Sequence, residues 1–142
     1  MTNTALKAPL KIGMSAITVF YGFVPAIADL NETHLFNPLW SEHARFHGAW
    51  SLAFAAGIAL FLVWVRDDVF LPIAFGLVFA AGFWVATLFR SAYGGALVDS
   101  NGHTHTIAGI ESNMFLFSVV SILLMIALAV ASKVYGEDRT RD

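Results

Sequence analysis

The sequence contains no cysteine and few charged residues. The absence of cysteine excludes disulfide bonds, thiolate metal sites, iron–sulfur clusters and cysteine nucleophiles. Any metal ion would therefore have to be held by imidazole and oxygen ligands. Charged residues make up only 13% of the 142 residues and the formal net charge is −2. Because nucleic-acid-binding domains carry a basic surface, this composition indicates no nucleic-acid partner.

Apolar residues are unusually abundant in this sequence. They make up 58% of the chain, and the mean hydropathy is +0.70. These values lie well above those of soluble domains, and a chain this short cannot hide so much apolar surface in a water-surrounded core. The composition predicts an integral membrane protein in contact with the lipid bilayer, and the length predicts a single domain over residues 1–142. Composition leaves open whether copies of the chain form a homo-oligomer.

Long apolar runs separated by short polar connections set the predicted architecture. We expect an all-α integral membrane protein, an antiparallel up-and-down four-transmembrane-helix bundle. The first run ends in Ala26-Ile27-Ala28, which has the form of a signal-peptide cleavage site, but the length of the run and Pro25 favour a retained span. The four predicted spans cover residues of about 12–30, 38–65, 69–90 and 106–133.

Small residues at four-residue spacing predict where the helices approach each other closely. They fall on the second, third and fourth spans. The residues are Ala49, Ala53 and Gly57, then Gly76 and Ala80, then Ala108 and Ser112.

Lysine and arginine are concentrated on one side of the predicted bundle. That side holds both termini and the turn between the second and third spans; its basic residues are Lys7, Lys11, Arg66, Lys133, Arg139 and Arg141. The other side carries only Arg45 and Arg90. The positive-inside rule then predicts cytoplasmic N- and C-termini, in what we expect to be a bacterial inner membrane. Residues 29–47 and 90–107 face the opposite, non-cytoplasmic compartment.

Every histidine of the chain falls in those two non-cytoplasmic segments: His34, His43, His47, His103 and His105. Asn37 is a good N-cap and Pro38 suits a first helical position, so we expect the second helix to begin there. Trp40, His43, His47 and Trp50 would then share one helix face. His43 and His47 stand one turn apart, so their rings can reach a common point.

These histidines have alternative interpretations. His43 and His47 could bridge polar groups at the membrane interface without binding a ligand. His103 and His105 are either further ligands or part of a solvated loop.

Glu111 is the most unusual acidic residue of the sequence, because it is predicted to lie about one turn inside the fourth helix. A carboxylate at that depth is costly and normally has a partner inside the bundle, here His43, His47, Asp29 or Arg90. Each helix would thus bring a polar group to the same level, an arrangement that builds sites in bundle cores. We predict metal ligands at His34, His43, His47 and Glu111, and catalytic groups at Glu111, His47 and Asp29.

The segment from Ala28 to His47 resembles a family of small four-span membrane proteins of unknown function from bacteria and fungi. The shared pattern is close to A-D-x-N-E-T-H-x-F-N-P-x-W-x-x-H-A-R-F-H. This sequence has Leu30 where the family often has tryptophan, and Ser41-Glu42 where two prolines are common. The resemblance implies the four-span fold but no reaction. It implies a site at Asp29, Asn31, His34, Asn37, His43 and His47.

Three functions are compatible with this polar cluster. The first is a metal-dependent enzyme, with iron, zinc or copper, acting on a lipophilic or quinone-like substrate. The second is a metal-free acid–base isomerase or hydrolase. The third is a non-enzymatic accessory subunit, a haem-binding protein or a small transporter. The lack of charge in the other half of the bundle disfavours an ion path through it.

Overall fold

The protein is described from a computed structural model that covers residues 3–65, 67–97 and 106–139. The prediction for His103 and His105 lies outside these residues. Four helices account for most of the described chain, and all four are long and apolar enough to cross a membrane. The predicted all-α four-helix membrane bundle is therefore confirmed. The helices are α1 (Asn3–Ala28), α2 (Glu42–Trp64), α3 (Phe70–Phe89) and α4 (Ser112–Arg139).

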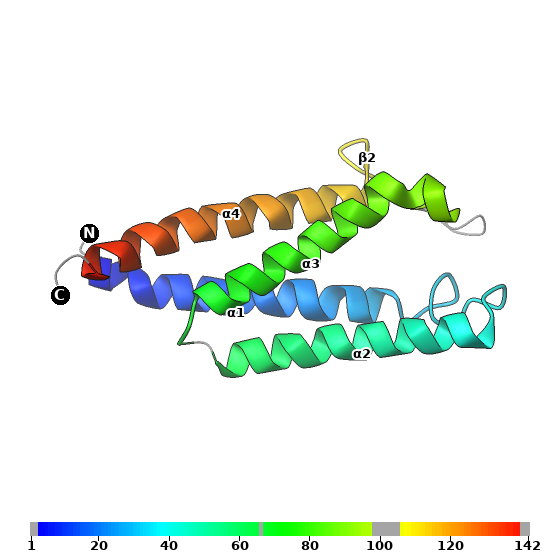
Figure 1. Cartoon of the computed structure of the whole chain (residues 1–142), viewed down its shortest axis with the longest axis horizontal. Coiled ribbons are helices and arrows are strands. Elements are labelled where there is room, and N and C mark those ends of the chain that lie inside the picture. The colour runs from blue at the N-terminus through cyan, green and yellow to red at the C-terminus, as the bar shows by residue number, and fades with distance from the viewer. Residues whose placement is uncertain (1–2, 66, 98–105, 140–142) are drawn as a thin grey trace.

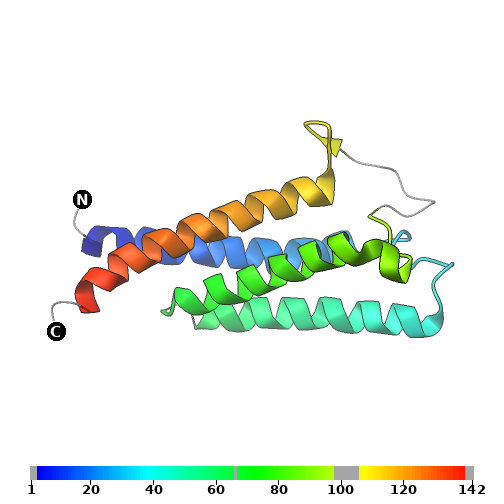
Figure 2. The same cartoon turned by 45° about the horizontal axis from the view of Figure 1, so that its top comes forward.

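Three short elements complete the fold at one end of the bundle. A 3-10 helix, η1 (Arg90–Tyr93), continues α3. Strands β1 (Thr106–Ile107) and β2 (Ile110–Glu111) pair antiparallel directly before α4. We call this the loop end, together with residues 29–41. The opposite end, with both termini and the turn between α2 and α3, is the terminal end (Figures 1 and 2).

Helix α1 occupies the centre of the arrangement, because it contacts each of the other three helices. Helix α2 packs mainly along α1, touches α3 only slightly and, within the described residues, makes no contact with α4. Helix α3 packs mainly on α4. Figure 1 shows α3 leaving the neighbourhood of α2 at the terminal end and rising towards α4. The bundle therefore widens between α2 and α3 towards the loop end.

The well-packed core lies between the middle of the bundle and its terminal end. The largest fully buried apolar side chains are Leu62, Val69, Ile73, Leu124 and Val134. An ion pair between Lys11 Nζ and Asp67 Oδ1, 2.8 Å apart, ties α1 to the turn before α3. Since lipid tails are as apolar as leucine, van der Waals packing of these side chains holds the helices together in the bilayer.

Helices α1 and α2 approach each other closely at a pair of small residues. A Cβ atom added at Gly22 would overlap the Cβ of Ala59. At Gly76 of α3, an added Cβ would lie 2.9 Å from the Leu124 side chain of α4. At Gly22 any side chain would push α1 and α2 apart, because the Ala59 Cβ cannot rotate away. At Gly76 the Leu124 side chain would have to shift.

The small-residue prediction is right for α3 and wrong elsewhere. Gly76 and Ala80 are buried as expected. The predicted stripe of α2, Ala49, Ala53 and Gly57, is exposed, and α2 instead meets α1 through Ala59. Ala108 precedes α4 and has a positive φ of 53°.

Helix α2 begins four residues later than the Asn37–Pro38 pair predicts. Ser41 is the N-cap, and its hydroxyl accepts a 3.2 Å hydrogen bond from the Ala44 N–H. Asn37 is 1% exposed and works inside the preceding loop. Its side chain donates to the Thr33 carbonyl at 3.1 Å and accepts from the Leu39 N–H at 2.9 Å. Asparagine is favoured in such Asx turns as well as at N-caps, which explains the error.

Candidate functional site

The loop after α1 is folded by the side chain of Asn31. Its Oδ1 accepts hydrogen bonds from the Thr33 N–H, the Thr33 hydroxyl and the His34 N–H, at 2.8, 2.7 and 3.1 Å. Its Nδ2 donates to the Ala28 carbonyl at 2.6 Å. This local network reverses the chain directly after α1 and brings His34 back beside Asp29.

Asp29 and His34 form the first polar pair. The His34 Nε2 lies 3.7 Å from the Asp29 Oδ1, and the other ring nitrogen, Nδ1, lies 2.9 Å from the Thr33 hydroxyl. Burial raises the pKa of the Asp29 carboxyl above its ordinary value, and the charge of a protonated His34 partly lowers it again. Asp29 therefore takes up a proton more readily than a solvated aspartate does.

His43 and His47 form the second polar pair, on the first two turns of α2. Their Nε2 atoms lie 3.1 Å apart, and the rings are almost perpendicular, at 89°. The Trp50 ring follows, with its centroid 6.0 Å from that of His47. Four residues were predicted to share one helix face, and three of them, His43, His47 and Trp50, lie on α2. Trp40 precedes the helix, and its ring lies over Gly48, where an added Cβ would be 3.5 Å away.

The prediction that Glu111 lies inside the fourth helix is wrong, because Glu111 directly precedes α4. Its carboxylate accepts hydrogen bonds from the N–H groups of Asn113 and Met114, both at 3.0 Å. It also accepts from the Asn113 side-chain amide at 3.1 Å. A carboxylate satisfies the unpaired N–H groups of a helix start and is stabilised by the helix dipole. Residues 106–111 form a β-hairpin whose two-residue loop contains Gly109 at φ 79°. Because of this hairpin, α4 starts at Ser112 and not near residue 106.

The predicted site residues therefore fall into separate groups. Asp29 pairs with His34, His43 pairs with His47, and Glu111 caps α4. Among residues 3–65, 67–97 and 106–139, no three histidine, aspartate or glutamate side chains gather closely enough to hold one metal ion together.

Beneath the Asp29–His34 pair lies a cavity of about 380 Å³, which we call the loop-end cavity. All four helices contribute to its wall, which is apolar and rich in aromatic rings apart from a few polar groups. Phe83 and Phe117 stack face to face in this wall, with ring centroids 3.8 Å apart. The polar residues of the lining are Asp29, His34, Ser51 and Asn113.

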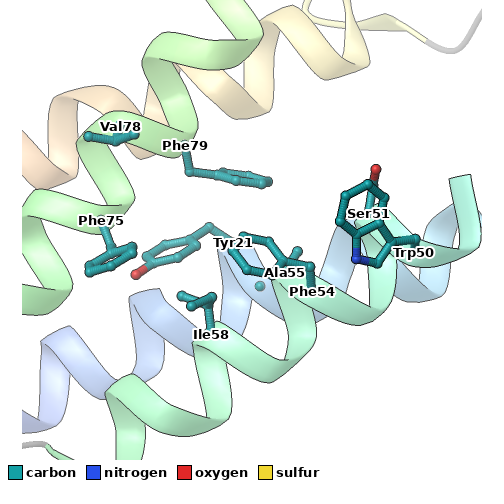
Figure 3. A pocket seen from close by; sticks show the side chains of 10 residues that line it. Tyr21, Trp50, Ser51, Phe54, Ala55, Ile58, Phe75, Val78 and Phe79 are labelled. Atoms are coloured by element: carbon teal, nitrogen blue, oxygen red, sulfur yellow. The ribbon is translucent and has the colours of Figure 1, made fainter. Parts of the chain in front are cut away.

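A second cavity of about 500 Å³, the lateral cavity, lies between α2 and α3 and touches α1 (Figure 3). It shares Tyr21, Ser51, Ala55 and Phe79 with the loop-end cavity, so the two adjoin. Figure 3 shows rings from α3 facing Tyr21 and the side chains of α2 across it. Its outer rim includes Val78, which is 71% exposed. The lateral cavity therefore opens sideways, towards the lipid.

The aromatic residues of the loop-end cavity were missing from the sequence prediction, which concentrated on ionisable groups. Phe79 and Phe83 stand one turn apart on α3, and Phe117 faces them from α4. Their spacing is a signal that the sequence does contain. Ordinary helix packing gives the same pattern, so it could not identify a cavity.

The comparisons with known proteins identify a family but no function. Residues 13–140, nearly the whole chain, match a family described as "family of unknown function (DUF6640)". No curated protein and no solved structure matches it. The predicted resemblance to a family of unknown function is confirmed, and the chain belongs to the DUF6640 family.

Proposed function

We propose that this protein binds a lipophilic ketone in the loop-end cavity and transfers protons on it with Asp29 and His34. The observation that carries the proposal is the position of this pair at the polar end of an otherwise apolar cavity. The reaction is metal-free acid–base isomerisation, and the substrate comes from the bilayer.

The size and lining of the cavity support a lipophilic ligand. Its volume of about 380 Å³ lies in the range of small-molecule sites, ~300–1,000 Å³. Aromatic walls suit a ring, and the few polar groups would orient a carbonyl towards residues 29 and 34. The adjoining lateral cavity gives a path between α2 and α3 along which such a compound can enter from lipid.

The chemistry follows from the two side chains. Burial raises the pKa of Asp29, so this carboxyl holds a proton more tightly than a solvated aspartate does. In the proposed step the protonated carboxyl donates a hydrogen bond to the ligand carbonyl. A neutral His34 can then remove a proton from the carbon next to that carbonyl, which gives the enol once Asp29 has passed its own proton to the oxygen. Return of the two protons gives the isomer or the starting ketone. The distance of 3.7 Å between His34 Nε2 and Asp29 Oδ1 is longer than a hydrogen bond. Both groups can therefore contact the ligand.

Deuterium exchange into a model ketone tests this proposal. Purified protein is incubated with 2-decylcyclohexanone in deuterated buffer, and label at the carbon next to the carbonyl is followed by mass spectrometry. We expect His34→Gln to lower the protein-dependent rate ~100-fold or more, the size of a lost general base, and Asp29→Asn to lower it too. Glu32→Gln, an exposed acid in the same loop, should leave the rate unchanged. Exchange no faster than in empty detergent micelles contradicts the proposed reaction.

We also propose that the site faces the non-cytoplasmic side of a bacterial inner membrane. The basic residues at the terminal end support cytoplasmic termini. Since the chain has no cysteine, single cysteines can map this orientation. Glu32→Cys should react with an impermeant maleimide in intact spheroplasts, and Gly136→Cys should react only after lysis. The reverse pattern contradicts this orientation. Homo-oligomerisation stays a prediction.

A further inference from the structure

We infer that α2 binds a divalent transition-metal ion through the Nε2 atoms of His43 and His47. This site is separate from the cavity and from the Asp29–His34 pair. The evidence is that both rings bring the same nitrogen, Nε2, to within 3.1 Å of its counterpart, and that both side chains are exposed at the loop end of α2.

The separation of the two nitrogens fits a shared ion. Imidazole nitrogens bind zinc at ~2.0–2.1 Å, so two of them placed 3.1 Å apart subtend an angle of about 100° at the ion. This angle lies between the ideal values for square-planar and tetrahedral coordination. Cu²⁺, Zn²⁺ and Ni²⁺ accept imidazole ligands in such geometries, and Cu²⁺ binds most tightly of the three.

The surroundings of the pair leave room for the rest of the coordination shell. His43 and His47 are both exposed, so water can fill the remaining positions. The positive end of the α2 dipole opposes a cation here, and Glu42 in the first turn offsets part of that effect. Arg45 lies two residues from each histidine, which places it on the other side of the helix.

Copper titration of the purified full chain tests the inference, with a purification tag that contains no histidine. One equivalent of CuSO₄ should give an electron paramagnetic resonance spectrum with hyperfine splitting from two nitrogens. Bound Cu²⁺ should also quench the fluorescence of Trp50, whose ring lies 6.0 Å from that of His47. Trp50→Phe should remove this part of the quenching without changing the spectrum.

Variants distinguish this site from the other histidines. His43→Ala and His47→Ala should each weaken Cu²⁺ binding roughly tenfold or more, while His34→Ala and the double variant His103→Ala/His105→Ala should bind as the wild type does. Unchanged affinity in His43→Ala and His47→Ala overturns the inference and leaves only a hydrogen bond between the two rings. An equal loss in either control overturns it as well, since the site would then need more than these two ligands. Circular dichroism of each variant verifies that the helices are intact.

Discussion

The two ends of this bundle are built differently. Towards the terminal end the helices meet through fully buried aliphatic side chains. Towards the loop end α2 and α3 separate, and the space between the helices becomes two adjoining cavities beneath a polar loop. The tight half supplies the fully buried aliphatic packing, and the open half carries polar and aromatic groups around two cavities.

The largest expected effect tests the packing of the tight half. Leu124 is fully buried, whereas its neighbour Leu123 is 43% exposed on the same helix. Leu124→Ala should lower the free energy of unfolding by ~2–5 kcal/mol through lost contacts and a cavity, and Leu123→Ala by less than ~1 kcal/mol. Thermal unfolding in detergent, followed by circular dichroism, compares the two. Equal losses would mean that this half is not tightly packed.

The next effect concerns the contact between α1 and α2. Gly22→Ala should destabilise the bundle by ~1–3 kcal/mol, because the added methyl group overlaps Ala59. Gly13→Ala on the same helix has open space around it and should be neutral or stabilising by up to ~1 kcal/mol. The same unfolding assay measures both. A stable Gly22→Ala protein would show that α2 can move away from α1 without cost.

The third effect is confined to the open half. Asn37→Ala removes a buried side chain that bonds the Thr33 carbonyl and the Leu39 N–H. Leaving such groups unsatisfied should cost ~1–3 kcal/mol of local stability. Hydrogen exchange of residues 29–41 should rise while the middle of α4 stays protected. Uniformly faster exchange in all helices would contradict the separation of the two ends.

The smallest effect is the pH dependence contributed by Asp29. Because burial raises the pKa of this carboxyl in the folded state, the folded protein binds its proton more tightly than the unfolded chain does. The resulting stability is fully present below the unfolded pKa, ~4, and is lost as the pH rises through the higher folded pKa.

The side chain of Asp29→Asn cannot ionise. The melting temperature of this variant should therefore rise relative to that of the wild type as the pH increases over this window. Glu32→Gln serves as an exposed control. A constant difference at every pH would indicate that Asp29 is fully solvated.

Hydropathy was sufficient to predict four spans, because each apolar run must be a helix in lipid. The starts of α2 and α4 were less predictable, since Asn37 and Glu111 each suit more than one local structure. Asn37 can cap a helix or close a loop, and only the packing of residues 29–41 selects the second. A glutamate near a helix start can be an intramembrane ligand or a cap, and the hairpin at residues 106–111 makes Glu111 a cap.

The polar pairs were only partly predictable. Helical spacing places His43 beside His47, so this pair follows from sequence alone. The approach of His34 to Asp29 depends on the turn organised by Asn31. The cavities depend on the divergence of α2 from α3, which no local pattern encodes.

The one-sided attachment of α2 has a consequence in the bilayer. With α1 as its main neighbour and no backbone contact with α4 in the described chain, α2 leaves most of its surface uncovered by the other helices. In a bilayer, acyl chains would therefore surround more of α2 than side chains do.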